Sequence, residues 1–214
     1  MSTNSGSQEQ GTTTATARLE MFSDGVFAIA ITLLVLEMHV PEFNGTGSLF
    51  DALKHEWAQL LAFFIGFMTI LICWINHHYM FTMIHRSNSA MILVNGGKLL
   101  VVTITPFATA LLSKNLGTEW ESAAVSLYCF NFLCMGAAMS GIWFFALRNG
   151  MVKAPSDEVL RCTTRLYIFP GIIAGLIFLI SFFSIAGCLV LSAVMFIVYI
   201  FPEKTARWLV KRSR

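Results

Sequence analysis

One stretch of the sequence, residues 18–41, combines a long apolar run with polar side chains that need partners. Arg18 and Asp24 lie in its first turns, and the remainder is apolar enough to cross a bilayer. A carboxylate about a turn and a half into a membrane helix is costly without a hydrogen-bond donor. We therefore expect Asp24 to accept hydrogen bonds from other side chains, and the candidate donors are Arg18, Trp74 and His77.

The same stretch carries an apolar stripe. With helical periodicity, Ile29, Leu33 and Leu36 fall on one face. Thr32 lies at the edge of this stripe, whereas Asp24 points well away from it. Most such stripes pack against other helices or face lipid. The alternative use is the narrow apolar neck of an ion pore, where an ion must shed water to pass and a hydroxyl offers it an oxygen.

Three histidines, His77, His78 and His85, lie close together in the sequence and invite comparison with a metal site. Adjacent histidines cannot both face one metal on a regular helix, and few carboxylates lie within reach. We therefore predict no metal and no cofactor. A membrane enzyme or assembly factor remains an alternative only through the His77-His78 pair.

Lys98 follows Gly96 and Gly97 in another apolar run. A lysine inside a membrane can act as a counter-ion or a proton-relay group. Snorkelling of the side chain to the near interface is the simpler account, and a break in the helix at the glycines is another alternative. We expect Lys98 to reach the membrane surface.

The composition defines the elements that must position these residues. Hydrophobic residues make up 56% of the 214 residues and charged residues 12%, which excludes an ordinary soluble domain. At about 20 residues per crossing, the chain holds about five to seven membrane helices and little else. The apolar runs predict an all-α integral membrane protein with six transmembrane helices, at about residues 18–41, 49–80, 90–113, 122–147, 166–185 and 186–201.

The last two apolar runs have almost no polar linker between them. As a single helix, residues 166–201 would span about 54 Å, well beyond the hydrocarbon core of about 30 Å. We therefore predict two helices with a tight reversal at residues 184–187. The string Pro155-Ser156-Asp157-Glu158 resembles a helix start ahead of them.

Polar tails flank the membrane domain, which we assign to residues 18–203. Residues 1–17 predict a disordered cytoplasmic tail, and residues 204–214 a basic cytoplasmic tail. With six crossings, all Lys and Arg at the ends of the apolar runs or between them fall on the side of the termini, except Lys54 and Lys114. The positive-inside rule then places both termini in the cytoplasm. The net charge of +2 is too small to indicate a nucleic-acid partner.

Several of these residues carry a resemblance to a known family. Arg18, the string Phe22-Ser23-Asp24 and the apolar run that follows resemble the first helix of the transmembrane protein 175 family, potassium channels of animal lysosomes and of bacteria. Further matches in the first half of the chain are Trp74, His77-His78, Asn95 and Pro106-Phe107.

The resemblance implies a bacterial-type homotetramer in the inner (plasma) membrane, with one six-helix repeat per subunit and the first helix of each subunit lining a central pore. It assigns pore lining and selectivity to Ile29, Thr32, Leu33 and Leu36. It also implies a structural polar network that holds the pore helix in place. The residues of this network are Arg18, Phe22, Ser23, Asp24, Trp74, His77 and Asn95.

The favoured function is a passive potassium-selective channel whose partners are potassium ions and the lipid bilayer. We predict that the protein is not an enzyme. Its first helices would form a hydrophobic constriction, because the string nearest to a carbonyl filter, Thr103-Ile104-Thr105-Pro106, has no glycine. The alternative is a cation- or proton-coupled secondary transporter that uses Asp24 and Lys98 as coupling groups. The internal repeats typical of transporters are not evident in the sequence.

Overall fold

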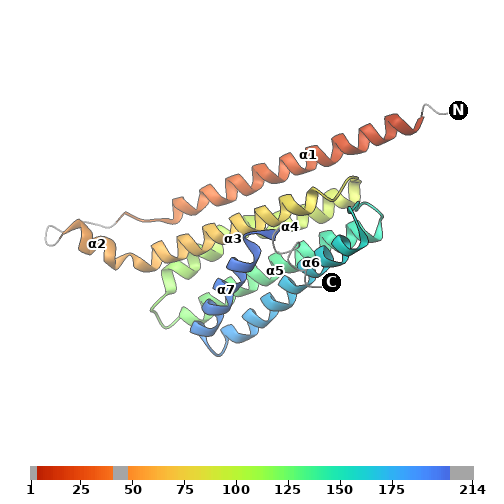
Figure 1. The fold of residues 1–214 in the computed structure, drawn as a ribbon. Helices are drawn as coiled ribbons and strands as arrows, with labels where there is room; N and C mark the ends of the chain where they lie inside the picture. The colour runs from red at the N-terminus through yellow and green to blue at the C-terminus, as the bar shows by residue number, and fades with distance from the viewer. Residues whose placement is uncertain (1–3, 41–47, 203–214) are drawn as a thin grey trace.

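The computed structural model describes residues 4–40 and 48–202, and nearly all of them are helical. The elements are α1 (Asn4–Leu33), the 3-10 helix η1 (Leu34–Glu37), α2 (Leu49–His55), α3 (Trp57–Phe81), α4 (Ser89–Asn115), α5 (Glu121–Arg148), α6 (Asp157–Ser181) and α7 (Ile185–Tyr199). In Figure 1 the helices α3 to α6 lie alongside one another and alternate in direction, and α1 lies along one side of them. The short α7 runs back from the end of α6.

In the described part of the chain, 5 helical segments are long and apolar enough to cross a membrane. The first of them, Ala15–Glu37, consists of the C-terminal part of α1 together with η1. The other four are the helices α3, α4, α5 and α6. The remaining apolar helix, α7, has 15 residues and a length of about 22 Å. The predicted all-α membrane fold is confirmed, and the last predicted helix is this short one.

Two predicted elements have other bounds in the structure. Helix α1 begins at Asn4, within the segment 1–17 that we predicted as a disordered tail. The run predicted at 49–80 is divided at Glu56 into α2 and α3. The predicted basic tail at 204–214 lies outside the described residues.

Serine side chains cap the helices of the second half where the sequence predicted helix starts. Ser156 Oγ accepts a hydrogen bond from the backbone N–H of Val159 at 3.3 Å, at the start of α6. Ser184 Oγ accepts one from the backbone N–H of Gly187 at 3.0 Å, at the start of α7. Each cap satisfies a backbone donor that the helix leaves unpaired. The predicted reversal between α6 and α7 is confirmed.

The helix α1 packs mainly on α3 and α4, at the edge of the bundle. Its side chain Phe27 belongs to a core cluster shared with Met91 of α4. Near the end of α1, a Cβ added at Gly66 of α3 would lie 2.6 Å from Thr109 Oγ1 and 3.2 Å from Leu34 Cδ2. A glycine at this point permits the helices to approach closely. The bundle therefore holds α1 along one face and leaves its other face uncovered.

Candidate pore helix and its polar anchor

The buried face of α1 and η1 is a stripe at helical spacing, formed by Leu19, Ser23, Phe27, Ala30 and Leu34. Each of these residues is at most 6% exposed. They recur every three or four positions, so they share the side of the helix that lies against α3 and α4. This face fixes the orientation of α1 relative to the rest of the chain.

The predicted apolar stripe lies on the uncovered face. In the single chain Ile29 is 61% exposed, Leu33 41% and Leu36 73%. The structure brings Ile29 and Leu33 together on the last turns of α1. Leu36 lies in η1, where the chain tightens into a 3-10 helix and side chains no longer follow the α-helical projection.

Thr32 is exposed between these apolar side chains. Its hydroxyl is directed at its own helix, with the carbonyl oxygens of Ala28 at 3.0 Å and Ile29 at 2.9 Å as acceptors. The hydroxyl hydrogen is thereby used within α1, and the oxygen keeps the capacity to accept. An acceptor oxygen thus lies on the same face as the stripe.

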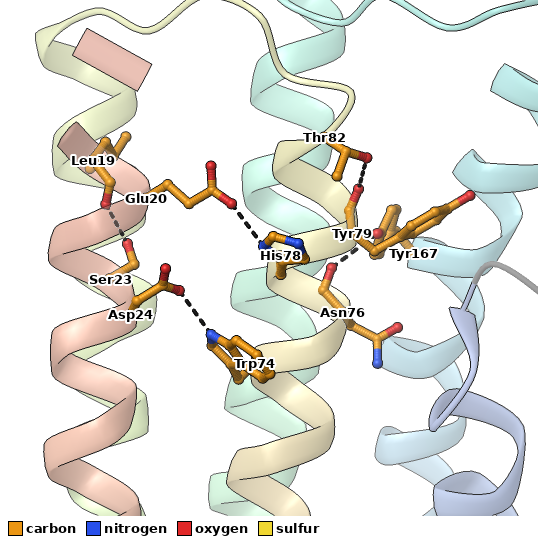
Figure 2. Close-up of polar contacts among 10 residues, drawn as sticks. All are labelled: Leu19, Glu20, Ser23, Asp24, Trp74, Asn76, His78, Tyr79, Thr82 and Tyr167. Atoms are coloured by element: carbon orange, nitrogen blue, oxygen red, sulfur yellow. Dashed lines mark hydrogen bonds and ion pairs between the residues drawn. The ribbon is translucent and has the colours of Figure 1, made fainter. Parts of the chain in front are cut away.

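Asp24 lies on the side of α1 that faces α3, as Figure 2 shows. The indole Nε1–H of Trp74 donates to Asp24 Oδ1 at 2.8 Å. A hydrogen bond to a carboxylate is stronger than one between neutral groups. Of the three donors predicted for Asp24, the structure therefore gives Trp74.

A second set of polar contacts ties α1 to both α4 and α3. Ser23 Oγ–H donates to the Leu19 carbonyl oxygen at 2.8 Å and accepts a hydrogen bond from Asn95 Nδ2 at 2.9 Å. The Asn95 Oδ1 atom lies 3.0 Å from His77 Nε2. Because Oδ1 can only accept, we assign the ring hydrogen of His77 to Nε2. Ser23, His77 and Asn95 are all 0% exposed, so this chain of contacts is an internal link between three helices.

Glu20 makes a further contact that the sequence analysis did not predict. Its Oε1 atom lies 2.9 Å from Nδ1 of His78, one turn along α1 from the Asp24 contact. The rings of His78 and Trp74 lie near each other, with 6.0 Å between their centroids. The available signal was matching spacing: two carboxylates one turn apart on α1 face two aromatic donors one turn apart on α3.

The opposite side of α3 is held by the second half of the chain. Tyr167 of α6 donates its hydroxyl hydrogen to the Asn76 carbonyl oxygen at 3.1 Å. The Asn76 side chain donates from Nδ2 to the Tyr199 carbonyl oxygen at the end of α7, at 2.9 Å. Helix α3 is thus a fixed support between α1 and the helices α6 and α7.

Lys98 does not reach the membrane surface. The residue is 0% exposed, and its Nζ atom has no hydrogen-bond partner among the residues that the structure describes. The Nζ atom lies 4.5 Å from the centroid of the Phe27 ring on α1. The helix α4 is unbroken from Ser89 to Asn115, so Lys98 lies about 14 Å from its start. The predicted snorkelling and the helix break are both wrong, because the side chain turns inward toward α1.

Two of the three histidines make contacts between helices: His77 binds Asn95, and His78 binds Glu20. The third, His85, has its Nδ1 atom 3.0 Å from the Met83 carbonyl oxygen, just after α3. Across residues 4–40 and 48–202 no group of three or more His, Cys, Asp and Glu side chains is placed to hold a metal ion.

Residues 18–106 match the family model described as the endosomal/lysosomal potassium channel TMEM175. A potassium channel of Chamaesiphon minutus is 38% identical to this chain, over 83% of this chain and 91% of that protein. The chain belongs to the TMEM175 family. The family predicted from the sequence is thereby confirmed.

A solved structure and an animal protein define the extent of the likeness. The crystal structure of a lysosomal potassium-selective channel TMEM175 homolog from Chamaesiphon minutus matches with a TM-score of 0.77 at 34% identity, covering 88% of this chain and 97% of that one. The endosomal/lysosomal proton channel TMEM175 of Bos taurus is 34% identical over 65% of this chain but over only 31% of its own length. The chain therefore corresponds to nearly the whole bacterial relative and to part of the animal one.

The TMEM175 match spans α1, α3 and α4, which carry the predicted polar network. Ser23, His77 and Asn95 form one linked set, and Asp24 with Trp74 forms another. Arg18 and Phe22 do not join them. Both lie on the exposed side of α1, and Phe22 is 63% exposed in the single chain.

Proposed function

We propose that this chain is one subunit of a homotetrameric potassium-selective channel, in which α1 of each subunit lines a central pore. The observation that carries the proposal is the division of α1 into two faces: a buried face anchored to α3 and α4, and an exposed apolar stripe. The bacterial relatives, which are named as potassium channels, support the choice of ion.

The position of α1 allows its stripe to meet other copies of the chain. The helix lies at the edge of the bundle, and its exposed face is not used by its own subunit. Gly25 and Ala28 are also exposed on this side, and a Cβ added at Gly25 would meet nothing within 4 Å. Small residues permit close approach between membrane helices. Four such faces can therefore converge around a closed four-fold axis.

Four Ile29 side chains around that axis form a narrow apolar neck. An ion in the neck loses water without carbonyl oxygens to replace it, so the barrier to passage is mainly dehydration. Potassium holds its water less tightly than sodium and meets the smaller barrier. Thr32 lies one turn further along the helix, where its acceptor oxygen can contact an ion that has lost part of its water.

Cytoplasmic termini and a location in the plasma membrane are part of this proposal. They are supported by the distribution of Lys and Arg, because with six crossings Arg86, Arg148 and Arg165 fall on the same side as the N-terminus. In this orientation the anchor formed by Glu20 and Asp24 lies in the cytoplasmic half of the pore helix. The apolar stripe begins about one turn further toward the outside.

A coupled secondary transporter is the second candidate, because Lys98 is a charged side chain buried completely inside the membrane domain. Buried charges of this kind serve coupling in many pumps and transporters. The two candidates differ in whether ion movement depends on protons.

Ion flux from proteoliposomes tests the proposal. The purified protein should pass potassium and caesium down their gradients faster than sodium, at a rate that an imposed proton gradient does not change. Empty vesicles are the control. Flux that requires a proton gradient, or that moves potassium against its own gradient, would identify a transporter instead.

A further inference from the structure

Lys98 is a buried charge that the proposed pore does not use. It comes from α4, is 0% exposed, and its Nζ atom lacks a hydrogen-bond partner in the described part of the chain. A buried ammonium without hydrogen bonds is costly unless another group stabilises the charge. The contact that the structure gives it is the ring of Phe27, 4.5 Å from Nζ to the ring centroid.

The Phe27 ring is held between two helices. It is 3% exposed, and its centroid lies 5.5 Å from that of the His77 ring on α3. The face of an aromatic ring carries negative potential, and a cation within about 6 Å of the centroid is attracted to it, most strongly where water is excluded.

Phe27 and Ile29 lie on nearly opposite faces of α1, because they are two residues apart on a helix. Their exposures reflect this, at 3% for Phe27 and 61% for Ile29. A contact that fixes the Phe27 ring therefore also fixes the rotation of α1 about its own axis. That rotation determines where the Ile29 side chain points.

We infer that Lys98 is a positioning residue for the pore helix. Its ammonium group holds the Phe27 ring through a cation–π contact, and this contact directs Ile29 toward the pore axis. The contact stands on the geometry of α1 and α4 alone, whereas its effect on Ile29 rests on the proposed function.

Fluorination of the Phe27 ring tests the inference. Phenylalanine with one, two or three ring fluorines at this position loses negative potential on the ring face step by step, with little change in shape. The midpoint of thermal unfolding should fall in the same order, by about 2–4 °C in total for a protein of this size. The ratio of sodium to potassium flux should rise in parallel, because Ile29 is no longer held in one direction.

The matched control is the same series in the Lys98→Met protein, which keeps the apolar stem and lacks the charge. There the unfolding midpoint should not depend on the number of fluorines. Should Lys98→Met fail to assemble, fluorination of Phe81 replaces this control. Phe81 is also buried, at 4% exposed, and also neighbours His77, with 4.4 Å between the two ring centroids. A steeper fall at Phe27 than at Phe81 supports the contact.

The inference is overturned if the unfolding midpoint of the protein with native Lys98 does not change with the number of fluorines at Phe27. It is also overturned if the midpoint falls no more steeply with fluorines at Phe27 than with fluorines at Phe81. A stepwise fall in stability with an unchanged flux ratio overturns the positioning role. Failure of the proposed function would give a different result. The native protein would carry no potassium flux, while the unfolding midpoint would still fall with each fluorine at Phe27.

Discussion

Replacing Ile29 with asparagine is expected to raise ion flux and to weaken the preference for potassium over sodium. Four amide groups at the neck supply oxygens in place of the lost water, so the barrier falls most for sodium, which holds its water more tightly. A barrier lower by about 1.4 kcal/mol speeds passage about tenfold, and we expect sodium flux to rise by about this factor. The measurement is sodium and potassium flux from proteoliposomes at equal protein content.

Two variants control for the polar substitution itself. Ile172 lies on α6 and is 55% exposed, so Ile172→Asn places the same amide on an exposed face away from α1 and should leave flux unchanged. Leu33→Asn, one turn from Ile29 and less exposed, should have a smaller effect than Ile29→Asn. A correctly assembled Ile29→Asn protein with native flux and native ion preference would show that this stripe does not line the pore.

Replacing Asp24 with alanine is expected to weaken the assembled protein more than it changes its ion preference. The carboxylate points toward α3, away from the stripe, and its loss leaves the indole N–H of Trp74 without its acceptor. A hydrogen bond to a charged group contributes about 1.5–3 kcal/mol, so the loss should lower both the unfolding midpoint and the yield of tetramer. Size-exclusion profiles and thermal unfolding measure the first effect, and flux ratios measure ion preference.

Two further variants serve as controls for Asp24→Ala. Asp24→Asn keeps an acceptor oxygen for Trp74 and should restore much of the stability. Asp51→Ala removes a carboxylate that is 60% exposed on α2, where an ion pair with Lys54 at 3.5 Å contributes little. An Asp24→Ala protein that assembles well and loses its ion preference as strongly as Ile29→Asn would instead place Asp24 in the ion path.

The fold and the division of α1 into two faces were predictable because both depend on local patterns. Long apolar runs define the membrane helices whatever their packing, and helical periodicity separates Ile29 and Leu33 from Asp24 without knowledge of the neighbouring helices. The Trp74 contact was also predictable, since a carboxylate in an apolar span needs a donor and few were available.

The remaining features depend on packing that the sequence does not show. The snorkelling prediction for Lys98 counts only the distance to the helix end, whereas the buried position follows from the facing ring of Phe27. The contact between Glu20 and His78 follows matching spacings on α1 and α3, but these spacings are informative only once the two helices are known to pack against each other. The backward extension of α1 to Asn4 joins a polar segment to the span, and composition alone suggested disorder there.

The most direct test of the central claim is the effect of cadmium on potassium flux through Ile29→Cys. Four thiols that converge on one axis form a site for a soft metal ion, which would close the neck. Four of the five native cysteines, Cys73, Cys129, Cys162 and Cys188, are buried, and Cys134 is only partly exposed, so the native protein should respond little. We predict that cadmium stops potassium flux through Ile29→Cys and leaves both the native protein and Ile172→Cys unaffected. Potassium flux through a correctly assembled Ile29→Cys protein that does not respond to cadmium would contradict the placement of α1 at the pore.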